Sequence, residues 1–399
     1  MKYSRVHMES IGYELPPVVV TSDDLESRLM PMYDELHIAP GQIEALTGIS
    51  ERRWWEEGHM LSDGAATAAR KALEQSNVKA QEIEALIYTG VCRENFEPAT
   101  ACAVAAQLGI KDDANIYDIS NACLGVMNGI IDIANRIELK QIRAGMVVSC
   151  ETSREIVEIM IERMLKERTM DMFSNSLATL TGGSGAAAVL LTDGSFENNK
   201  THKLLGGANQ SAPEYHKLCR WGVTLSPVAL GELMFSPDKL LAAIDQVMEP
   251  DALPSAVKDI MNSNKIPPVL ASIMPSQKLP DALIEFMSTD SVAVLKHGAK
   301  LGVKTWGSFL TKMGWARDQV DKVICHQVGE GHRDTILKEL GIDPAKDFST
   351  YQYLGNIGTV SVPLTAAIAE QRQFLKPGDR VSFLGIGSGL NCLMLGWEW

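Results

Sequence analysis

Residues 71–90 read KALEQSNVKAQEIEALIYTG, and residues 308–327 read SFLTKMGWARDQVDKVICHQ. Aligned without a gap, both segments predict a helix, a polar turn and a strand of four or five apolar residues. A second echo follows each of them: a predicted helix at 123–138 precedes GMVVSC, and one at 361–374 precedes RVSFLGIG. The two segments share a pattern more than residue identities, and this repetition favours a duplicated α/β architecture.

Short apolar runs alternate with helical patterns through the first 200 residues. Strands are predicted at 84–91, 115–119, 144–150 and 186–192. Helices are predicted at 62–76, 99–109, 123–138 and 153–166. This alternation predicts a mostly parallel sheet that is covered on both faces.

A proline-rich region separates the two halves. Residues 222–286 contain eight prolines and two helix-like pieces, at 238–248 and 255–263. They are interpreted as an inserted helical region, which leaves open a lid, a wall of a substrate channel or surface decoration. The predicted organisation is an N-terminal half at 1–195, a connecting region at 196–286 that holds the insertion, and a C-terminal half at 287–399.

Composition narrows the class of protein. The 399 residues carry a formal net charge of −13, which argues against a nucleic-acid-binding protein but not against an anionic ligand. No signal-peptide pattern and no apolar run of about 18 residues is present, so no membrane span is expected. Seven scattered cysteines form no C-x-x-C pair, and the histidines lack metal-ligand spacing. We therefore expect a cytoplasmic enzyme without a metal site.

Cys123 lies in SNACLGVMNGIIDIANRI, residues 120–137. Apolar residues recur there at helical spacing, so Cys123 is predicted to begin a helix directly after a strand. The partial positive charge of a helix N-terminus stabilises a thiolate and lowers the pKa of the thiol. The alternative is a buried structural cysteine.

Three further residues supply the hydrogen-bond donors that a cysteine nucleophile and its thioester substrate need. His326 ends a predicted strand, Asn356 lies in the turn YLGNIGTVSVP, and Gly389 follows a strand in LGIGSGLNC. Each also has an ordinary structural interpretation, as a strand-end histidine, a turn asparagine and a close-packing glycine. The Gly-rich string TGGSGAAAV at 181–189 lacks the lysine of a phosphate loop and precedes a strand, so that interpretation is rejected.

These strings resemble a known family. NACLGVMNG, HQV, GNIGTVSVP and GIGSGLN are similar to the Cys, His, Asn and C-terminal Gly motifs of ketosynthase III enzymes in the thiolase superfamily, and TGISERRWW is similar to their early TGI-x-x-R segment. ENFEPATA and KLCR extend the resemblance to OleA-type acyl-CoA condensing enzymes. The resemblance covers roughly residues 1–221 and 287–399. It implies a thiolase fold of duplicated αβαβα layers and a homodimer.

The resemblance also implies roles for the site residues. Cys123 would accept the first acyl group, and His326 with Asn356 would polarise the thioester carbonyl of the second substrate. The backbone N–H groups of Cys123 and Gly389 would form the oxyanion hole. Glu97 would reach into the neighbouring subunit's active site as the base that removes the α-proton. The alternative for Glu97 is an ordinary surface carboxylate.

Coenzyme A would enter as the carrier of the acyl group. Arg52, Arg53 and Arg220 are candidates for contacts with its phosphates, with surface salt bridges as the alternative. The resemblance implies no metal, flavin or nicotinamide cofactor.

The implied reaction joins two long-chain acyl-CoA thioesters without loss of carbon dioxide and gives a β-keto acid after thioester hydrolysis. It would be the first step of a long-chain, olefin-type hydrocarbon synthesis. The runner-up is a decarboxylating ketosynthase III that uses a malonyl thioester. A thiolase proper, with Cys392 near its second cysteine, and an inactive partner subunit are further alternatives.

Overall fold

The computed structural model describes residues 1–196, 201–225 and 283–399. The chain divides into two compact units, Met1–Arg220 together with Ser288–Trp399, and Trp221–Met287. In the second unit, the structure describes residues 221–225 and 283–287, which belong to the paired strands β9 and β10. The helices predicted at 238–248 and 255–263 lie outside the described residues.

The first unit is built on a nine-stranded sheet in the order β11-β12-β13-β8-β1-β7-β6-β4-β5. Its strands are β1 (His7–Glu14), β4 (Ala85–Thr89), β5 (Asn115–Ile119), β6 (Ala144–Glu151), β7 (Gly185–Thr192), β8 (His202–Ser211), β11 (Lys322–Cys325), β12 (Arg380–Gly387) and β13 (Asn391–Glu398). The pairs β4–β5, β4–β6 and β11–β12 are parallel, whereas β1, β7, β8 and β13 pair antiparallel. The prediction of a mostly parallel sheet is therefore wrong, because the chain adds antiparallel strands beside each parallel core.

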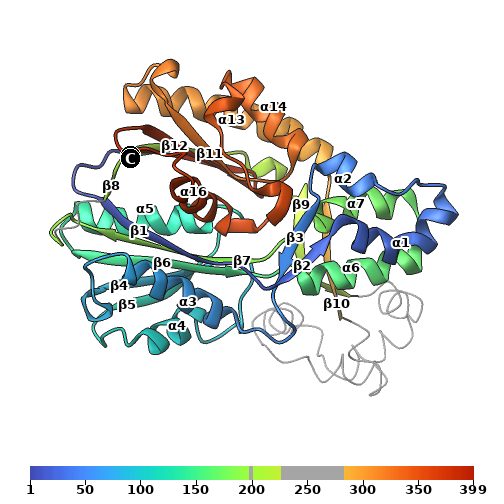
Figure 1. Ribbon diagram of the computed structural model, residues 1–399, viewed down its shortest axis with the longest axis horizontal. Helices are drawn as coiled ribbons and strands as arrows, with labels where there is room; N and C mark the ends of the chain where they lie inside the picture. Colours follow the sequence, from blue (N-terminus) through green and yellow to red (C-terminus); the bar gives the residue numbers. More distant parts are fainter. Residues whose placement is uncertain (197–200, 226–282) are drawn as a thin grey trace, which may run out of the picture. The chain divides into compact units, whose positions relative to one another are not determined.

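Helices cover both faces of the sheet and separate its two parts (Figure 1). Helices α3 (Leu61–Glu74) and α4 (Thr100–Leu108) lie outside the β4–β7 part. Helices α13 (Ser291–Met313) and α14 (Glu330–Leu340) lie outside the β11–β13 part. Helices α5 (Gly125–Glu138) and α16 (Ser361–Gln371) pack between the two parts, which gives the five layers αβαβα.

The other elements of the described chain connect or flank these layers. They are β2 (Val18–Thr21), α1 (Ser22–Leu36), α2 (Gln42–Thr47), β3 (Glu51–Trp54), η1 (Ala80–Glu82), α6 (Arg154–Glu167), α7 (Met170–Leu180), η2 (Pro213–Tyr215), β9 (Cys219–Leu225), β10 (Leu283–Thr289), η4 (Arg317–Gln319), η5 (Pro344–Lys346), α15 (Tyr351–Leu354) and η6 (Gly358–Val360).

The predicted duplication is present in the fold. Helix α3, the short helix η1 and strand β4 recur as α13, η4 and β11. The pair α5 and β6 recurs as α16 and β12. Each half thus contributes one helix to the middle layer.

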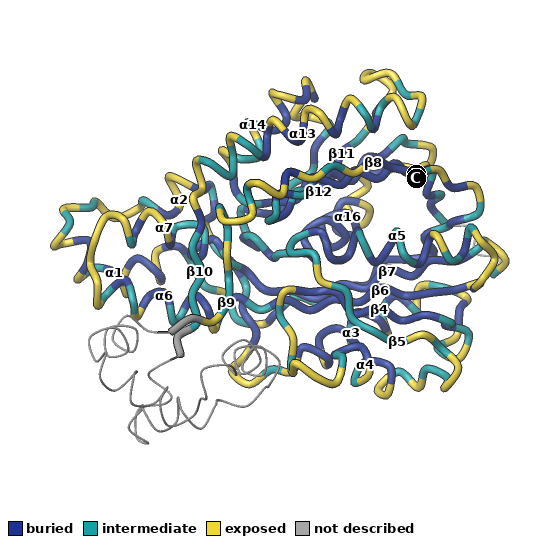
Figure 2. Tube along the Cα trace, turned by 180° about the vertical axis from the view of Figure 1, so that it is seen from behind, coloured by how far each residue is buried: buried dark blue, intermediate teal, exposed yellow. Residues whose placement is uncertain are grey.

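The buried residues lie along the strands and the middle layer, shown dark blue in Figure 2. Every residue of β6 and of β7 is buried. A strand buried along its whole length requires cover on both faces of the sheet, and this explains the continuous apolar runs in these strands.

Candidate active site

Cys123 lies in the turn between β5 and α5. The helix begins at Gly125, two residues after the predicted start, so Cys123 precedes its first turn. Ala122 has a φ of 44°, in the left-handed region that side chains other than glycine rarely adopt. Strained residues of this kind cluster at functional sites, where the surrounding structure holds them.

The Cys123 thiol is difficult to ionise. Burial, together with the nearby acidic groups of Cys219 and Glu151, raises the pKa of this thiol to about 12. The predicted lowering of this pKa by the helix N-terminus is therefore wrong, because desolvation outweighs the helix charge. One N–H group of that helix end, on Val126, donates to Thr359 Oγ1 at 2.7 Å. The thiol is protonated near neutral pH, so any reaction as a nucleophile requires the loss of this proton.

His326 directly follows β11, and its backbone N–H donates to Leu384 O at 2.8 Å. Its side chain is buried, and burial together with the neighbouring His332 lowers the pKa of the imidazole to about 3. The ring is consequently neutral at physiological pH. A neutral imidazole has one N–H donor, which suits it to polarise a carbonyl oxygen.

Asn356 is held in its turn by the backbone. Its N–H donates to Thr181 O at 2.8 Å, and its carbonyl accepts from Gly183 N at 2.9 Å. The side-chain oxygen Oδ1 accepts from Gly358 N at 3.1 Å. With Oδ1 used inside the turn, the NH₂ group remains as the donor that a thioester oxygen needs.

The Gly-rich string at 181–189 serves this packing. A Cβ added to Gly183 would lie 1.9 Å from Leu354 O, so only glycine fits against the segment that leads to Asn356. This close contact gives the string a structural role and agrees with its rejection as a phosphate loop.

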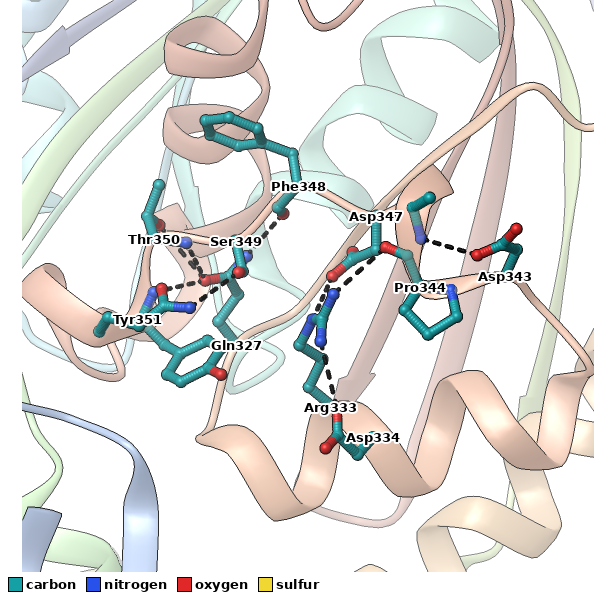
Figure 3. A network of polar contacts seen from close by, with 12 residues as sticks. Gln327, Arg333, Asp334, Asp343, Pro344, Asp347, Phe348, Ser349, Thr350 and Tyr351 are labelled. Atoms are coloured by element: carbon teal, nitrogen blue, oxygen red, sulfur yellow. Dashed lines mark hydrogen bonds and ion pairs between the residues drawn. The ribbon is translucent and has the colours of Figure 1, made fainter. Parts of the chain in front are cut away.

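A hydrogen-bond network ties the end of β11 to the segment before Asn356 (Figure 3). Gln327, the residue after His326, is 4% exposed. Its Oε1 accepts from the backbone N–H groups of Thr350 and Tyr351, each at 2.7 Å. Its Nε2 donates to Phe348 O at 3.1 Å. One buried amide therefore links the residue after His326 to the segment that leads to Asn356.

The Gly389 turn lies against the Cys123 turn. A Cβ added to Gly387 would lie 3.4 Å from Cys123 N. Asn391, just after Gly389, donates through Nδ2 to Asn121 Oδ1 at 3.2 Å. The backbone segments that carry the two predicted oxyanion donors are thus in contact.

Two further bonds join the four turns across the halves of the fold. Val126 N donates to Thr359 Oγ1, and Gln327 N donates to Ser361 Oγ at 3.0 Å. The first links the start of α5 to the Asn356 turn, and the second links that turn to the end of β11. The structure thereby brings together the segments that carry the predicted nucleophile, histidine, asparagine and glycine.

Glu97 lies apart from this cluster. It is exposed on the 93–99 loop and has no hydrogen-bond or ion-pair partner within the described part of its own chain. Its neighbour Phe96 is 99% exposed. An exposed aromatic residue beside the candidate base is typical of a surface that contacts another protein.

The three arginines occupy different environments. Arg52 is fully buried, and its guanidinium donates to Val20 O at 3.4 Å and Ser22 Oγ at 3.1 Å. Its prediction as a phosphate contact is wrong, because no part of its side chain reaches the surface. Arg53 is partly buried and donates to Pro16 O, whereas Arg220 is exposed.

A cavity of about 580 Å³ lies among α1, α2, α7 and the start of α13. Its wall includes apolar side chains such as Phe173 and Leu177, and it also reaches Thr289. The Thr289 hydroxyl donates to Cys219 Sγ at 3.4 Å, and Cys219 is one of the groups that raise the pKa of Cys123. One hydrogen bond therefore connects the wall of this cavity to a neighbour of Cys123.

Sequence reasoning missed three residues that organise this site, namely Glu151, Gln327 and Thr359. Glu151 directly follows a buried apolar run, and such a charged residue at a strand end is a signal that was available. The other two lie inside the HQV and GNIGTVSVP strings, close to His326 and Asn356.

Among residues 1–196, 201–225 and 283–399, no group of three or more His, Cys, Asp or Glu side chains is placed to hold a metal ion. No helix in these ranges is long and apolar enough to cross a membrane. All seven cysteines are free thiols.

Comparisons with known proteins agree with the fold and the motifs. Residues 310–399 match the 3-oxoacyl-[acyl-carrier-protein (ACP)] synthase III C-terminal family, and residues 47–171 match the thiolase N-terminal domain. The chain is 51% identical to the acyl-CoA:acyl-CoA alkyltransferase of Shewanella oneidensis over 401 residues, with 100% of both chains covered. It is 32% identical to the protein of the same name from Xanthomonas campestris, again over 100% of both chains.

Solved structures give the same result. The chain matches an OleA variant from Xanthomonas campestris with bound lauric acid and lauroyl-CoA, with a TM-score of 0.80, 32% identity and 100% of both chains covered. It also matches a cerulenin-bound OleA from the same organism, with a TM-score of 0.82, 32% identity, and 100% and 98% of the two chains covered. A more distant relative, the β-ketoacyl-[acyl-carrier-protein] synthase III of Clostridium tetani, is 26% identical over 98% of this chain and 97% of its own.

Proposed function

Because this chain belongs to the OleA-type acyl-CoA:acyl-CoA alkyltransferases of the thiolase superfamily, we propose that it condenses two acyl-CoA thioesters through an acyl-enzyme on Cys123. The observation that supports the proposal is the series of contacts that links the Cys123 turn to the Gly389 turn, to the Asn356 turn and, through it, to the end of β11. The reaction is a non-decarboxylative Claisen condensation that ends in a β-keto acid.

In the first half-reaction, the Cys123 sulfur attacks the thioester carbon of one acyl-CoA. The thiol loses its proton as the new S–C bond forms, and coenzyme A leaves as the free thiol. Negative charge develops on the carbonyl oxygen, where the backbone N–H groups of Cys123 and Gly389 are the proposed donors. The contact between their two turns supports this assignment.

In the second half-reaction, the α-proton of another acyl-CoA is removed. His326 and Asn356 donate to its thioester oxygen, and a neutral imidazole with a free amide NH₂ fits this role. The resulting enolate carbon attacks the acyl-enzyme, and the sulfur of Cys123 leaves. Hydrolysis of the β-keto thioester then releases the acid and coenzyme A.

Glu97 is the proposed base, supplied by the partner subunit of a homodimer. Its exposed loop leads into α4, whose first backbone N–H groups donate to Asp118 of β5, one of the two edge strands of the sheet. An unpaired edge strand and the exposed ring of Phe96 suit an interface between two copies of this chain.

Substrate binding completes the proposal. The cavity near Phe173 is the proposed space for an alkyl chain, and Ser174→Phe is expected to shorten the longest chain that is condensed. Arg53 and Arg220 remain candidates for the phosphates of coenzyme A. The proposed reaction requires no metal, flavin or nicotinamide. A cytoplasmic location and a place at the start of long-chain hydrocarbon synthesis stay predictions.

The test is incubation of the pure protein with one long-chain acyl-CoA and no malonyl thioester. Mass spectrometry should detect the β-keto acid, or the ketone formed when it loses carbon dioxide. Cys123→Ala should abolish the product and leave the fold intact, and Glu97→Ala should also abolish it.

The second candidate function is a decarboxylating ketosynthase III, supported by the similarity to the Clostridium tetani enzyme. It predicts a different outcome of the same incubation. Product that forms only after a malonyl thioester is added would replace the proposed reaction and remove the role of Glu97.

A further inference from the structure

Glu151, at the end of β6, is a buried carboxylate that the proposed reaction does not use. It is 4% exposed, and burial raises the pKa of its carboxyl group. Its oxygens accept from the backbone N–H groups of Val91 at 3.0 Å and Cys92 at 3.2 Å. Keeping a carboxylate in the interior is costly, so the bonds it makes deserve a functional explanation.

The same carboxylate also holds the Asn356 turn. The backbone N–H of Thr359 donates to Glu151, and a Cβ added to Gly358 would lie 3.3 Å from Glu151 Cγ. The Thr359 hydroxyl in turn accepts from Val126 N, in the first turn of α5. A continuous chain of bonds therefore runs from Glu151 through the Asn356 turn to the helix that follows the nucleophile.

On its other side, Glu151 anchors the loop that carries Glu97. Val91 and Cys92 form the base of that loop. The far end is held by a second carboxylate, Asp118, which accepts from the backbone N–H groups at the start of α4 at 3.0 and 2.9 Å. The loop is thus fixed at both ends while its tip stays exposed.

We propose that Glu151 is a positioning residue for the condensation. It fixes the Asn356 turn against the start of α5, and it fixes the base of the loop that presents Glu97. The inference rests on the proposed function. The Asn356 turn and the Glu97 loop both serve the condensation only if Asn356 and Glu97 act on an acyl thioester.

The test compares Glu151→Gln with Glu138→Gln. Glutamine keeps the shape of Glu151 but replaces one accepting oxygen with an NH₂ group, which cannot accept from a backbone N–H. Glu138 is the matched control, because it also accepts from two successive backbone N–H groups, those of Ser4 at 2.9 Å and Arg5 at 3.1 Å. It ends α5, about 20 Å from the start of that helix.

Glu151→Gln should lose more thermal stability than Glu138→Gln, because Glu151 is buried whereas the bond from Ser4 N to Glu138 is exposed, so kcat is compared in the folded proteins. Glu151→Gln should lower kcat roughly 10- to 100-fold with KM changed less than about threefold, because misplacement of reacting groups by about 1 Å has such effects. Glu138→Gln should keep the wild-type kcat. Equal kcat values for the two variants would overturn the proposal.

A second readout requires no acyl-CoA. The titratable groups that face Glu151 are Tyr88, Cys92, Cys123 and Cys150. Removal of the negative charge should lower the pKa of the Cys123 thiol. The rate of alkylation of Cys123 by iodoacetamide is followed by peptide mass spectrometry as the pH is raised. This rate should begin to increase at a lower pH in Glu151→Gln than in the wild type, and at the wild-type pH in Glu138→Gln.

The two readouts separate the possible failures. A shifted alkylation profile in a protein that makes no β-keto product rejects the proposed function but retains the link between Glu151 and the nucleophile. An unshifted profile overturns the link. If Glu151→Gln does not fold, Thr359→Val breaks the same chain of bonds at its next step, and a wild-type kcat in that variant overturns the proposal.

Discussion

Substitution of Gln327 by leucine should cost stability out of proportion to its single amide group. Its Oε1 is the acceptor for the backbone N–H groups of Thr350 and Tyr351, both in buried residues at the start of α15. Leucine leaves both donors without this acceptor, and each unsatisfied buried donor costs about 1–3 kcal/mol. The loss is therefore roughly 2–6 kcal/mol, reduced by about 1 kcal/mol for the added apolar burial.

Equilibrium unfolding in urea, followed by tryptophan fluorescence, measures this cost. Gln352→Leu is the matched control, because its amide donates only to Ser349 Oγ at 3.1 Å and leaves no backbone donor behind. The control should cost less than about 1.5 kcal/mol. A Gln327→Leu protein that is no less stable than the control would refute the argument. The folded fraction should also show a lower kcat, since His326 precedes the substituted residue.

Three other outcomes are expected. The pKa of His326 is lowered from 6.5 to about 3 in the folded protein. As the pH falls, the unfolded chain therefore binds a proton at this histidine before the folded chain does. Stability should fall as the pH drops from 6.5 toward 3, and less so in His326→Gln; equal falls would contradict this. Gly183→Ala places a Cβ 1.9 Å from a backbone oxygen and should lower the thermal midpoint strongly, whereas Gly307→Ala, in an open part of α13, should stabilise by about 0.5–1 kcal/mol. Mixed Cys123→Ala and Glu97→Ala chains should recover up to about a quarter of wild-type activity if the base acts across a symmetric dimer, and no recovery would place Glu97 elsewhere.

The parts of the fold that sequence predicts well are the buried parallel strands and their helices. The sequence predicts strands β6 and β7 within one residue at each end, because their apolar runs are continuous. Local sequence does not predict strand β1, since HMESIGYE carries two carboxylates and has no long apolar run. In the fold, Glu9 of this strand is buried and accepts from Thr192 Oγ1 at 2.5 Å. Local sequence patterns cannot reveal a partner that lies 183 residues away. For the same reason they cannot reveal that the sheet contains antiparallel strands.

The candidate site shows the same division. The sequence indicates Cys123, His326 and Asn356 as candidates, because each lies in a motif string and the strings follow one another in order. The pKa of the Cys123 thiol and the solvent exposure of Arg52 could not be predicted from these motifs. The thiol pKa moves upward instead of downward, and Arg52 is buried instead of exposed, because both properties depend on how much solvent the packed structure leaves around a group.

Duplication explains why the site lies where it does. Helices α5 and α16 are equivalent elements of the two halves, and both start in the middle layer of the fold. The turn before α5 carries Cys123, and the turn before α16 carries Asn356. The hydrogen bond from Val126 to Thr359 joins these two helix starts directly. Two copies of one structural unit can therefore divide the chemistry, because each presents the same backbone position to a shared space. In the proposed reaction, one copy supplies the nucleophile and the other supplies the groups that polarise its substrate.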